Sequence, residues 1–116
     1  MMRSKYGARQ IIDSKGRMHD SKAEFRRCHE LELLERAGEI RDLRRQVKHV
    51  LIPAQYDSSG KLLEKAITYT SDFEYVDVRT GEAVVEDVKG VKTKDYIIKR
   101  KLMLWIYKIR ITEVNA

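Results

Sequence analysis

Hydrophobic and polar positions follow two different periods along this chain. Residues 21–37, SKAEFRRCHELELLERA, are rich in helix formers, begin with the capping pattern Ser-x-x-Glu and end before Gly38, so they predict a helix. Residues 65–78 alternate as a strand does, with one face formed by Ile67, Tyr69, Ser71, Phe73 and Tyr75 and the other by Thr68, Thr70, Asp72 and Glu74.

The remaining elements complete an α, β-meander, α, β order. Residues 39–55 predict an extended segment or edge strand that stops by Pro53, and residues 84–91 predict a strand that returns from the turn RTGEA. A second helix is expected from Asp95 to about Lys108, and a short strand over residues 109–114. At 116 residues the chain fits one compact domain.

Charged residues interrupt the apolar stretch AVVEDVKGVKT, residues 83–93. Side chains two apart on a strand share a face, so Asp87 and Lys89 are expected on one side with Val85, whereas Glu86 is expected on the other. The preceding strand is expected to pair with this one and to supply Asp72. Two carboxylates would then converge beside one lysine.

This arrangement has the chemistry of a divalent-metal site. Asp72, Asp87 and the backbone carbonyl of Val88 are hard oxygen ligands, which suit Mg²⁺ or Mn²⁺. Lys89 would position or help to deprotonate an attacking water molecule. The alternative is a hairpin with cross-strand ion pairs of about 0.2–1 kcal/mol each and no catalytic role.

The motifs YTSDF and VVEDVKG, in this order, resemble the PD-(D/E)XK nuclease superfamily, with Asp72, Asp87 and Lys89 at the motif positions. Together with KYG and DSKAEFRRCHELELLERAGEIRDLRRQ, they resemble small phage and prophage proteins related to Holliday-junction resolvases, from about Lys5 to Val114. Ser71 stands where the superfamily name has Pro, and the middle acid is Asp rather than Glu. Glu86 is a competing candidate that strand parity disfavours.

The resemblance implies an α/β (α+β) fold, with a restriction-endonuclease-like αβββαβ core and a central mixed sheet flanked by helices. It implies a Mg²⁺- or Mn²⁺-dependent endodeoxyribonuclease that hydrolyses phosphodiester bonds of branched or structured DNA. The setting would be phage DNA recombination, repair or processing in the cytoplasm of a bacterial host.

Glu24 has two interpretations. It stands three residues after Ser21, where a capping-box glutamate reaches back to the cap, yet a helical wheel places it on the inward stripe between Cys28 and Leu31. The resemblance implies that a glutamate of the first helix reaches the metal site, as a ligand or as an acid that orients water. We therefore include Glu24 with the catalytic and metal-binding residues.

The formal net charge of +6 favours a polyanionic partner. Residues 1–20 are expected to form a basic arm or short hairpin, and residues 21–116 the nuclease-like domain. The cations expected to contact DNA are Arg3, Lys5, Arg9, Lys92, Lys94 and Lys101. For Lys101 the alternative is a side chain that only extends along the edge of the helix.

The segment LMLWIY, residues 102–107, is apolar around the whole helix. Either it contacts a second copy in a homodimer, as two-strand cleavage requires, or it is a central helix buried in one domain. No apolar segment approaches the ~18 residues of a membrane span, so no membrane association is expected. Two other functions stay open: a non-catalytic nucleic-acid-binding module on the same fold and, more weakly, a dimeric interaction protein.

Overall fold

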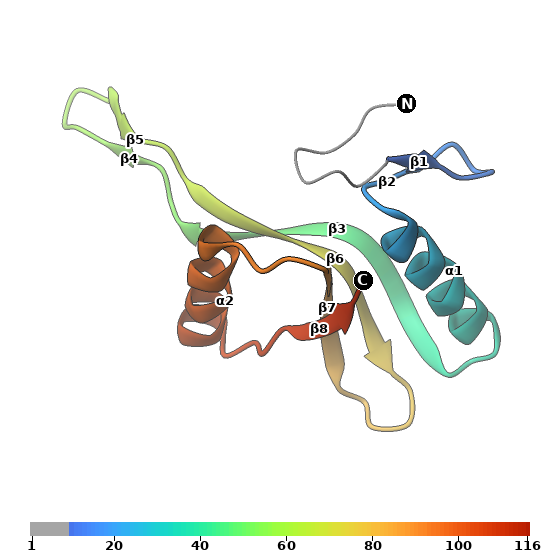
Figure 1. Cartoon of the computed structure of the whole chain (residues 1–116). Helices are drawn as coiled ribbons and strands as arrows, with labels where there is room; N and C mark the ends of the chain where they lie inside the picture. The colour runs from blue at the N-terminus through green and yellow to red at the C-terminus, as the bar shows by residue number, and fades with distance from the viewer. Residues whose placement is uncertain (1–9) are drawn as a thin grey trace.

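A four-stranded mixed β-sheet forms the centre of the computed structural model, which describes residues 10–116 (Figure 1). The strand order is β3–β6–β7–β8, with bounds Ile40–Ile52, Ile67–Asp77, Ala83–Lys89 and Thr112–Asn115. Neighbours are antiparallel except for β7 and β8, which are parallel and joined through a helix. The mixed α/β architecture predicted from the sequence is confirmed, with β3 at the sheet edge.

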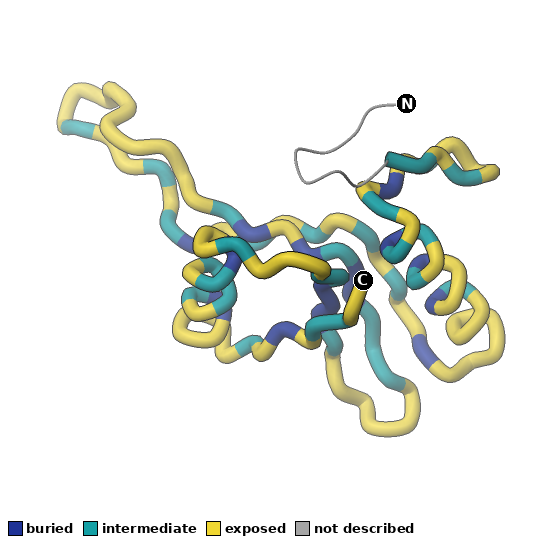
Figure 2. The backbone as a smooth tube through the Cα atoms, in the orientation of Figure 1, coloured by how far each residue is buried: buried dark blue, intermediate teal, exposed yellow. Residues whose placement is uncertain are grey.

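The two helices pack against opposite faces of the sheet. Helix α1 (Lys22–Arg36) begins after Ser21, whose hydroxyl accepts a hydrogen bond from the Glu24 amide, and α2 (Lys94–Tyr107) begins after Thr93 in the same way. The buried cluster on the α1 side contains Cys28, Leu31, Ile40 and Phe73. The cluster on the α2 side contains Leu51, Tyr69, Val85, Tyr96, Met103 and Ile111 (Figure 2).

Two small hairpins extend this core. Strands β1 (Ile11–Ile12) and β2 (Met18–His19) form one of them beside α1, in the region where an arm or hairpin was expected. Strands β4 (Gln55–Tyr56) and β5 (Leu62–Glu64) form the other, which projects away from the sheet (Figure 1). Strands β4 and β5 were not predicted, because a two- or three-residue strand has too few positions to show a period.

The side-chain alternation predicted for β6 is wrong in its second half. Tyr69 belongs to the cluster on the α2 side, but Phe73, four residues later, belongs to the cluster on the α1 side. Ser71 and Glu74, three residues apart, lie on the same side, because the Ser71 hydroxyl donates to Glu74 at 2.8 Å. The alternation therefore changes phase around Asp72.

Glu86 is part of the packing between α1 and the sheet. Its carboxylate is 1% exposed and accepts two hydrogen bonds from Arg27 of α1, at 2.9 and 2.7 Å, and one from the Tyr75 hydroxyl. Asp87 and Lys89 contact each other and the α2 side, so the face assignment predicted for β7 is confirmed. Glu86 thereby has a structural role and does not compete with Asp87.

Helix α2 is not buried on all sides. Ile98, Leu104 and Trp105 are exposed, Trp105 by 76%, while Tyr96 and Met103 face the sheet. The alternative of a central helix enclosed in one domain is therefore wrong. Among residues 10–116, no helix is long and apolar enough to cross a membrane.

Replacing Arg27 with alanine should lower the free energy of unfolding by about 3–5 kcal/mol, because it leaves the Glu86 carboxylate buried without its cation. Urea denaturation followed by circular dichroism measures the change. Arg26→Ala, one residue earlier and exposed, is the matched control and should stay within about 0.5 kcal/mol of the wild type. Equal effects of the two substitutions would contradict the assigned role of the Arg27–Glu86 pair.

Candidate functional site

The candidate site lies where strands β6 and β7 separate. Their ladder pairs Val76 with Ala83 and continues to Phe73 with Glu86, where it ends. In the same register, the next facing residues are Asp72 and Asp87. Facing carboxylates repel each other and destabilise strand pairing, so these two acids lie where regular pairing stops.

Asp72 takes the place of a backbone partner for β7. Its Oδ2 accepts a hydrogen bond from the Val88 amide at 2.7 Å. The carboxylate thereby reaches β7 beyond the last paired residues and lies beside Val88, whose carbonyl is the third predicted ligand. The contact fixes the spacing between the two strands at the site.

Asp87 is held by groups from two strands, β6 and β7. Its Oδ2 accepts a hydrogen bond from the Tyr69 hydroxyl of β6 at 2.6 Å, and its Oδ1 lies 3.2 Å from Lys89 Nζ. The ammonium of Lys89 also lies 4.3 Å from the ring centroid of Tyr96 in α2. These contacts orient both the carboxylate and the ammonium toward the same small region.

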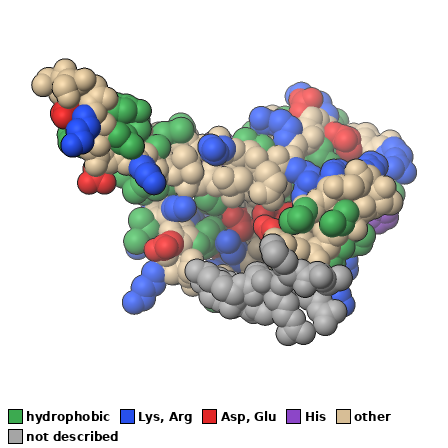
Figure 3. Space-filling view, turned by 90° about the horizontal axis from the view of Figure 1, so that it is seen from above, with side chains coloured by type: hydrophobic (Ala, Val, Ile, Leu, Met, Phe, Trp, Pro, Cys, Tyr) green, Lys and Arg blue, Asp and Glu red, His purple; other side chains and the backbone are tan. Residues whose placement is uncertain are grey.

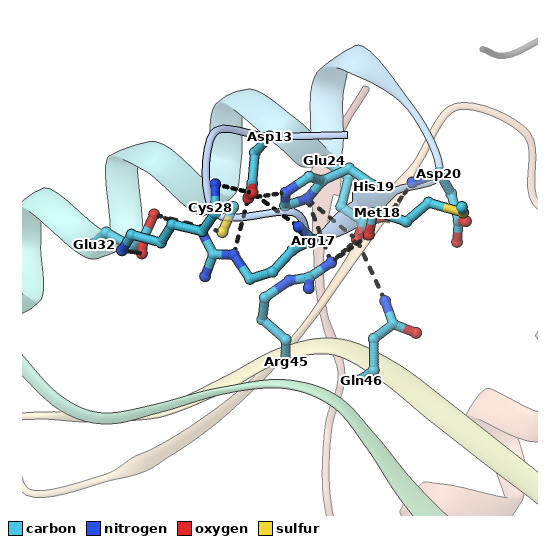
Figure 4. A network of polar contacts seen from close by, with 11 residues as sticks. Asp13, Arg17, Met18, His19, Asp20, Glu24, Cys28, Glu32, Arg45 and Gln46 are labelled. Atoms are coloured by element: carbon cyan, nitrogen blue, oxygen red, sulfur yellow. Dashed lines mark hydrogen bonds and ion pairs between the residues drawn. The ribbon is translucent and has the colours of Figure 1, made fainter. Parts of the chain in front are cut away.

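Glu24 enters the site from the first turn of α1. Its side chain is buried, and its Oε2 accepts from the Asp20 amide at 3.3 Å, while Oε1 faces Arg45 at 3.4 Å and Gln46 at 3.3 Å (Figure 4). One oxygen therefore accepts from the backbone just before the helix, close to the expected capping position, and the other accepts from side chains of β3. The two interpretations of Glu24 are compatible in this geometry.

A local distortion of β3 brings Arg45 and Gln46 to Glu24 together. Consecutive strand residues normally point to opposite faces, but Gln46 has φ = 53°, in the left-handed region. Both side chains extend from β3 toward Glu24 in Figure 4. In the β3–β6 register Gln46 lies opposite Asp72, the residue where the alternation of β6 changes phase. The irregular residues of β3 and β6 therefore face each other, next to Glu24.

The electrostatics of the site oppose the ionisation of Asp72. Burial, followed by repulsion from Asp87 and Glu24, raises the pKa of Asp72 from 3.8 to about 8, although the Val88 amide and Lys89 lower it. Burial, followed by repulsion from Asp20, also raises the pKa of Glu24. Such a concentration of buried carboxylates requires either bound protons or a cation.

The oxygen ligands at the site suit a hard divalent cation when a backbone carbonyl is counted with the side chains. In the described part of the chain, no three His, Cys, Asp or Glu side chains form a ready-made metal site. Two carboxylates and a backbone carbonyl, completed by water and a phosphate oxygen, are the ligands that Mg²⁺ commonly takes. Asp72, Asp87 and Val88 would hold the ion, with Glu24 close enough to Asp72 to affect its pKa.

The cations expected at DNA lie in three regions. Arg3, Lys5 and Arg9 fall outside the described residues. Lys92 lies in the loop after β7, where its ammonium is 3.2 Å from Glu113, and Lys94 is exposed at the first residue of α2. Lys101 is exposed further along α2, on the side that carries Leu104 and Trp105.

Four residues at the site were missed from the sequence, namely Tyr69, Tyr96, Arg45 and Gln46. Tyr69 has a weak signal, because it stands three residues before Asp72 on the same predicted strand. Gln46 has none, since a left-handed residue inside a strand leaves no mark in the pattern of side chains. The contacts of all four depend on how strands and helices meet.

Comparison with known protein families gives one match. Residues 3–115 match the family described as "Protein of unknown function (DUF1064)", and the chain belongs to this family. The comparisons match no curated protein and no solved structure to the chain.

The free energy of unfolding should decrease as pH rises from about 4 to about 8. Between the ordinary pKa of 3.8 and the folded pKa of about 8, folded Asp72 keeps a proton that the unfolded chain has lost. The contribution of this single group is at most about 1.4 kcal/mol per pH unit. Urea denaturation at a series of pH values measures the slope.

Asp72→Asn should flatten this slope and stabilise the protein at pH 8, since an amide still accepts from Val88 but carries no charge. Asp95→Asn, an exposed position in α2, should keep the wild-type slope. An unchanged slope in Asp72→Asn would rule out Asp72 as the titrating group.

Proposed function

We propose that this protein is a divalent-metal-dependent DNA endonuclease of the PD-(D/E)XK type, acting on branched or structured DNA in the manner of Holliday-junction resolvases. The observation that carries the proposal is the convergence of Asp72 and Asp87, beside Lys89, where β6 and β7 separate. A purely structural hairpin gains nothing from two facing acids in a buried site. Hydrolysis of a phosphodiester uses all three groups.

The roles proposed for the side chains follow from their contacts. A Mg²⁺ or Mn²⁺ ion bound by Asp72, Asp87 and the Val88 carbonyl would offset the phosphate charge and favour ionised water. Tyr69 would keep Asp87 in its ligand orientation through the 2.6 Å hydrogen bond. Lys89, held between Asp87 and the Tyr96 ring, would position the attacking water, and Glu24 would orient it from α1.

The surface around the site is compatible with a phosphate-bearing substrate. Acidic and basic side chains lie together near the centre of the face drawn in Figure 3. Without a metal, Asp72 and Asp87 would repel DNA, and a bound cation removes this repulsion. The preference for branched DNA, the phage or prophage origin and the bacterial cytoplasm follow from the family resemblance, and they belong to the proposal.

Asp87→Asn should reduce the cleavage rate at least about hundredfold, because a metal contributes several kcal/mol to the charge stabilisation of phosphoryl transfer. Lys89→Ala should have an effect in the same direction. The assay uses four-way junction, flap, single-stranded and duplex DNA with Mg²⁺ or Mn²⁺, and gel electrophoresis measures the products.

Asp95→Asn makes the same chemical change at an exposed position and should cleave as the wild type does. Cleavage by Asp87→Asn at the wild-type rate would exclude this mechanism. If the wild type binds these DNAs but cuts none of them with either metal, the alternative of a non-catalytic nucleic-acid-binding module is favoured.

A homodimer is the second part of the proposal. The exposed apolar side of α2, with Ile98 and Trp105, is larger than one small domain needs, and the projecting β4–β5 hairpin also exposes Leu62 and Leu63. A two-fold axis would place two sites on two strands of a branched DNA. Two cuts could then be made in one binding event.

Trp105→Glu should convert the dimer to a monomer of 13.6 kDa, because it places a carboxylate within the proposed apolar contact. Sedimentation equilibrium measures the mass. Leu33→Glu makes the same kind of change at an exposed position of α1, on the opposite face of the sheet, and should leave the dimer intact. A wild-type protein that is monomeric at all accessible concentrations would exclude the dimer.

A further inference from the structure

A pocket of about 490 Å³ lies between α2 and β8, and Lys101 is the one lining residue to which a role is assigned above. It is lined by three cations, Arg100, Lys101 and Arg110, and by an apolar group, Leu104, Ile109 and Ile111. Glu113 is its one acidic residue. We refer to it as the α2–β8 pocket.

The α2–β8 pocket adjoins the carboxylate site. Glu113 on β8 lies opposite Asp87 in the parallel register of β7 and β8. The pocket and the carboxylate site are also connected through Tyr96, whose ring centroid is 4.3 Å from Lys89 Nζ and 5.9 Å from Arg100 Cζ. Lys89 and Arg100 are therefore no farther apart than these two distances combined, which is a span of a few nucleotides along a DNA strand.

The charge of the pocket is positive once its internal pairs are counted. Glu113 accepts from the Tyr96 hydroxyl at 2.6 Å and from Arg100 at 3.1 Å, and Lys92 lies 3.2 Å away. The hydrogen bond from Tyr96, followed by those from Arg100 and Lys92, lowers the pKa of Glu113 to about 2, so its single negative charge is already matched.

Lys101 and Arg110 differ from these paired cations. Both are exposed, and among residues 10–116 neither forms an ion pair. Both line the pocket beside the apolar side chains of Leu104, Ile109 and Ile111, and the remaining charged residues, Arg100 and Glu113, pair with each other. An anion with an apolar part attached matches this combination, and a nucleotide of a DNA strand has both.

We propose that the α2–β8 pocket binds a phosphate of the DNA strand near the one held at the carboxylate site. Lys101 and Arg110 contact the phosphate oxygens, and the neighbouring sugar packs on Leu104, Ile109 and Ile111. Arg100 keeps its hydrogen bond to Glu113 at the edge of the pocket. The inference rests on the proposed function for the identity of the ligand, and it assigns the direction in which the strand leaves the site.

The test measures binding of a fluorescent four-way junction by anisotropy at several salt concentrations, with Ca²⁺ in place of Mg²⁺ so that the carboxylates hold a cation while cleavage is suppressed. The double variant Lys101→Ala/Arg110→Ala should bind about tenfold more weakly at 0.1 M salt. Its plot of log K against log salt should be shallower by at least about 0.9, the value for one lost phosphate contact. Lys61→Ala/Lys65→Ala removes the same charge from the β4–β5 hairpin and should match the wild type in both respects.

Equal losses in the two double variants would show a general effect of net charge and overturn the proposal, as would wild-type binding by Lys101→Ala/Arg110→Ala. If that variant melts at a lower temperature than the wild type, the single exposed change Lys101→Glu replaces it with the same expectation. Cleavage in Mg²⁺ is measured separately. A wild type that binds the junction through these cations but does not cut it refutes the endonuclease and leaves the pocket assignment in place.

Discussion

Repulsion between Asp72 and Asp87 is the constraint on which the site and the nearby fold depend. The two carboxylates face each other at the first position where β6 and β7 no longer pair, and Glu24 adds a third acid from α1. The surrounding contacts reduce this repulsion without removing it. The Val88 amide holds Asp72, and Tyr69 and Lys89 hold Asp87. Burial, followed by the remaining repulsion from Asp87 and Glu24, keeps the pKa of Asp72 high.

The neighbouring acid Glu86 is also buried, but a cation of the protein balances its charge. It is as buried as Asp87 and is adjacent to it in the chain, but it faces α1, where Arg27 provides two hydrogen bonds. Its charge is thus matched within the protein, and it contributes to the packing of α1 on the sheet. Among residues 10–116, Asp72 forms no such ion pair, and this difference separates the acids of a site from the acid of a core.

Strands β3 and β6 are both distorted, and at residues that face each other. Gln46 adopts a left-handed conformation in β3, and β6 changes phase at the facing residue, Asp72. Regular strands would direct Asp72 and its neighbours alternately to the two faces of the sheet. The irregular pair instead leaves Asp72 close to both Glu24 and Asp87, whose charges raise its pKa. Strain of this kind is typical of functional sites.

The sequence by itself determined the order of the main elements, the start of the first helix after Ser21, and the opposite faces of Glu86 and Asp87, because these depend on local periodicity and capping. It also indicated the burial of Glu24 from the helical wheel. Only the tertiary structure decided the change of phase in β6, the contacts of Tyr69 and Gln46, the exposure of α2 and the position of the α2–β8 pocket. These features arise where segments far apart in the chain meet, and neither period nor composition carries information about such contacts.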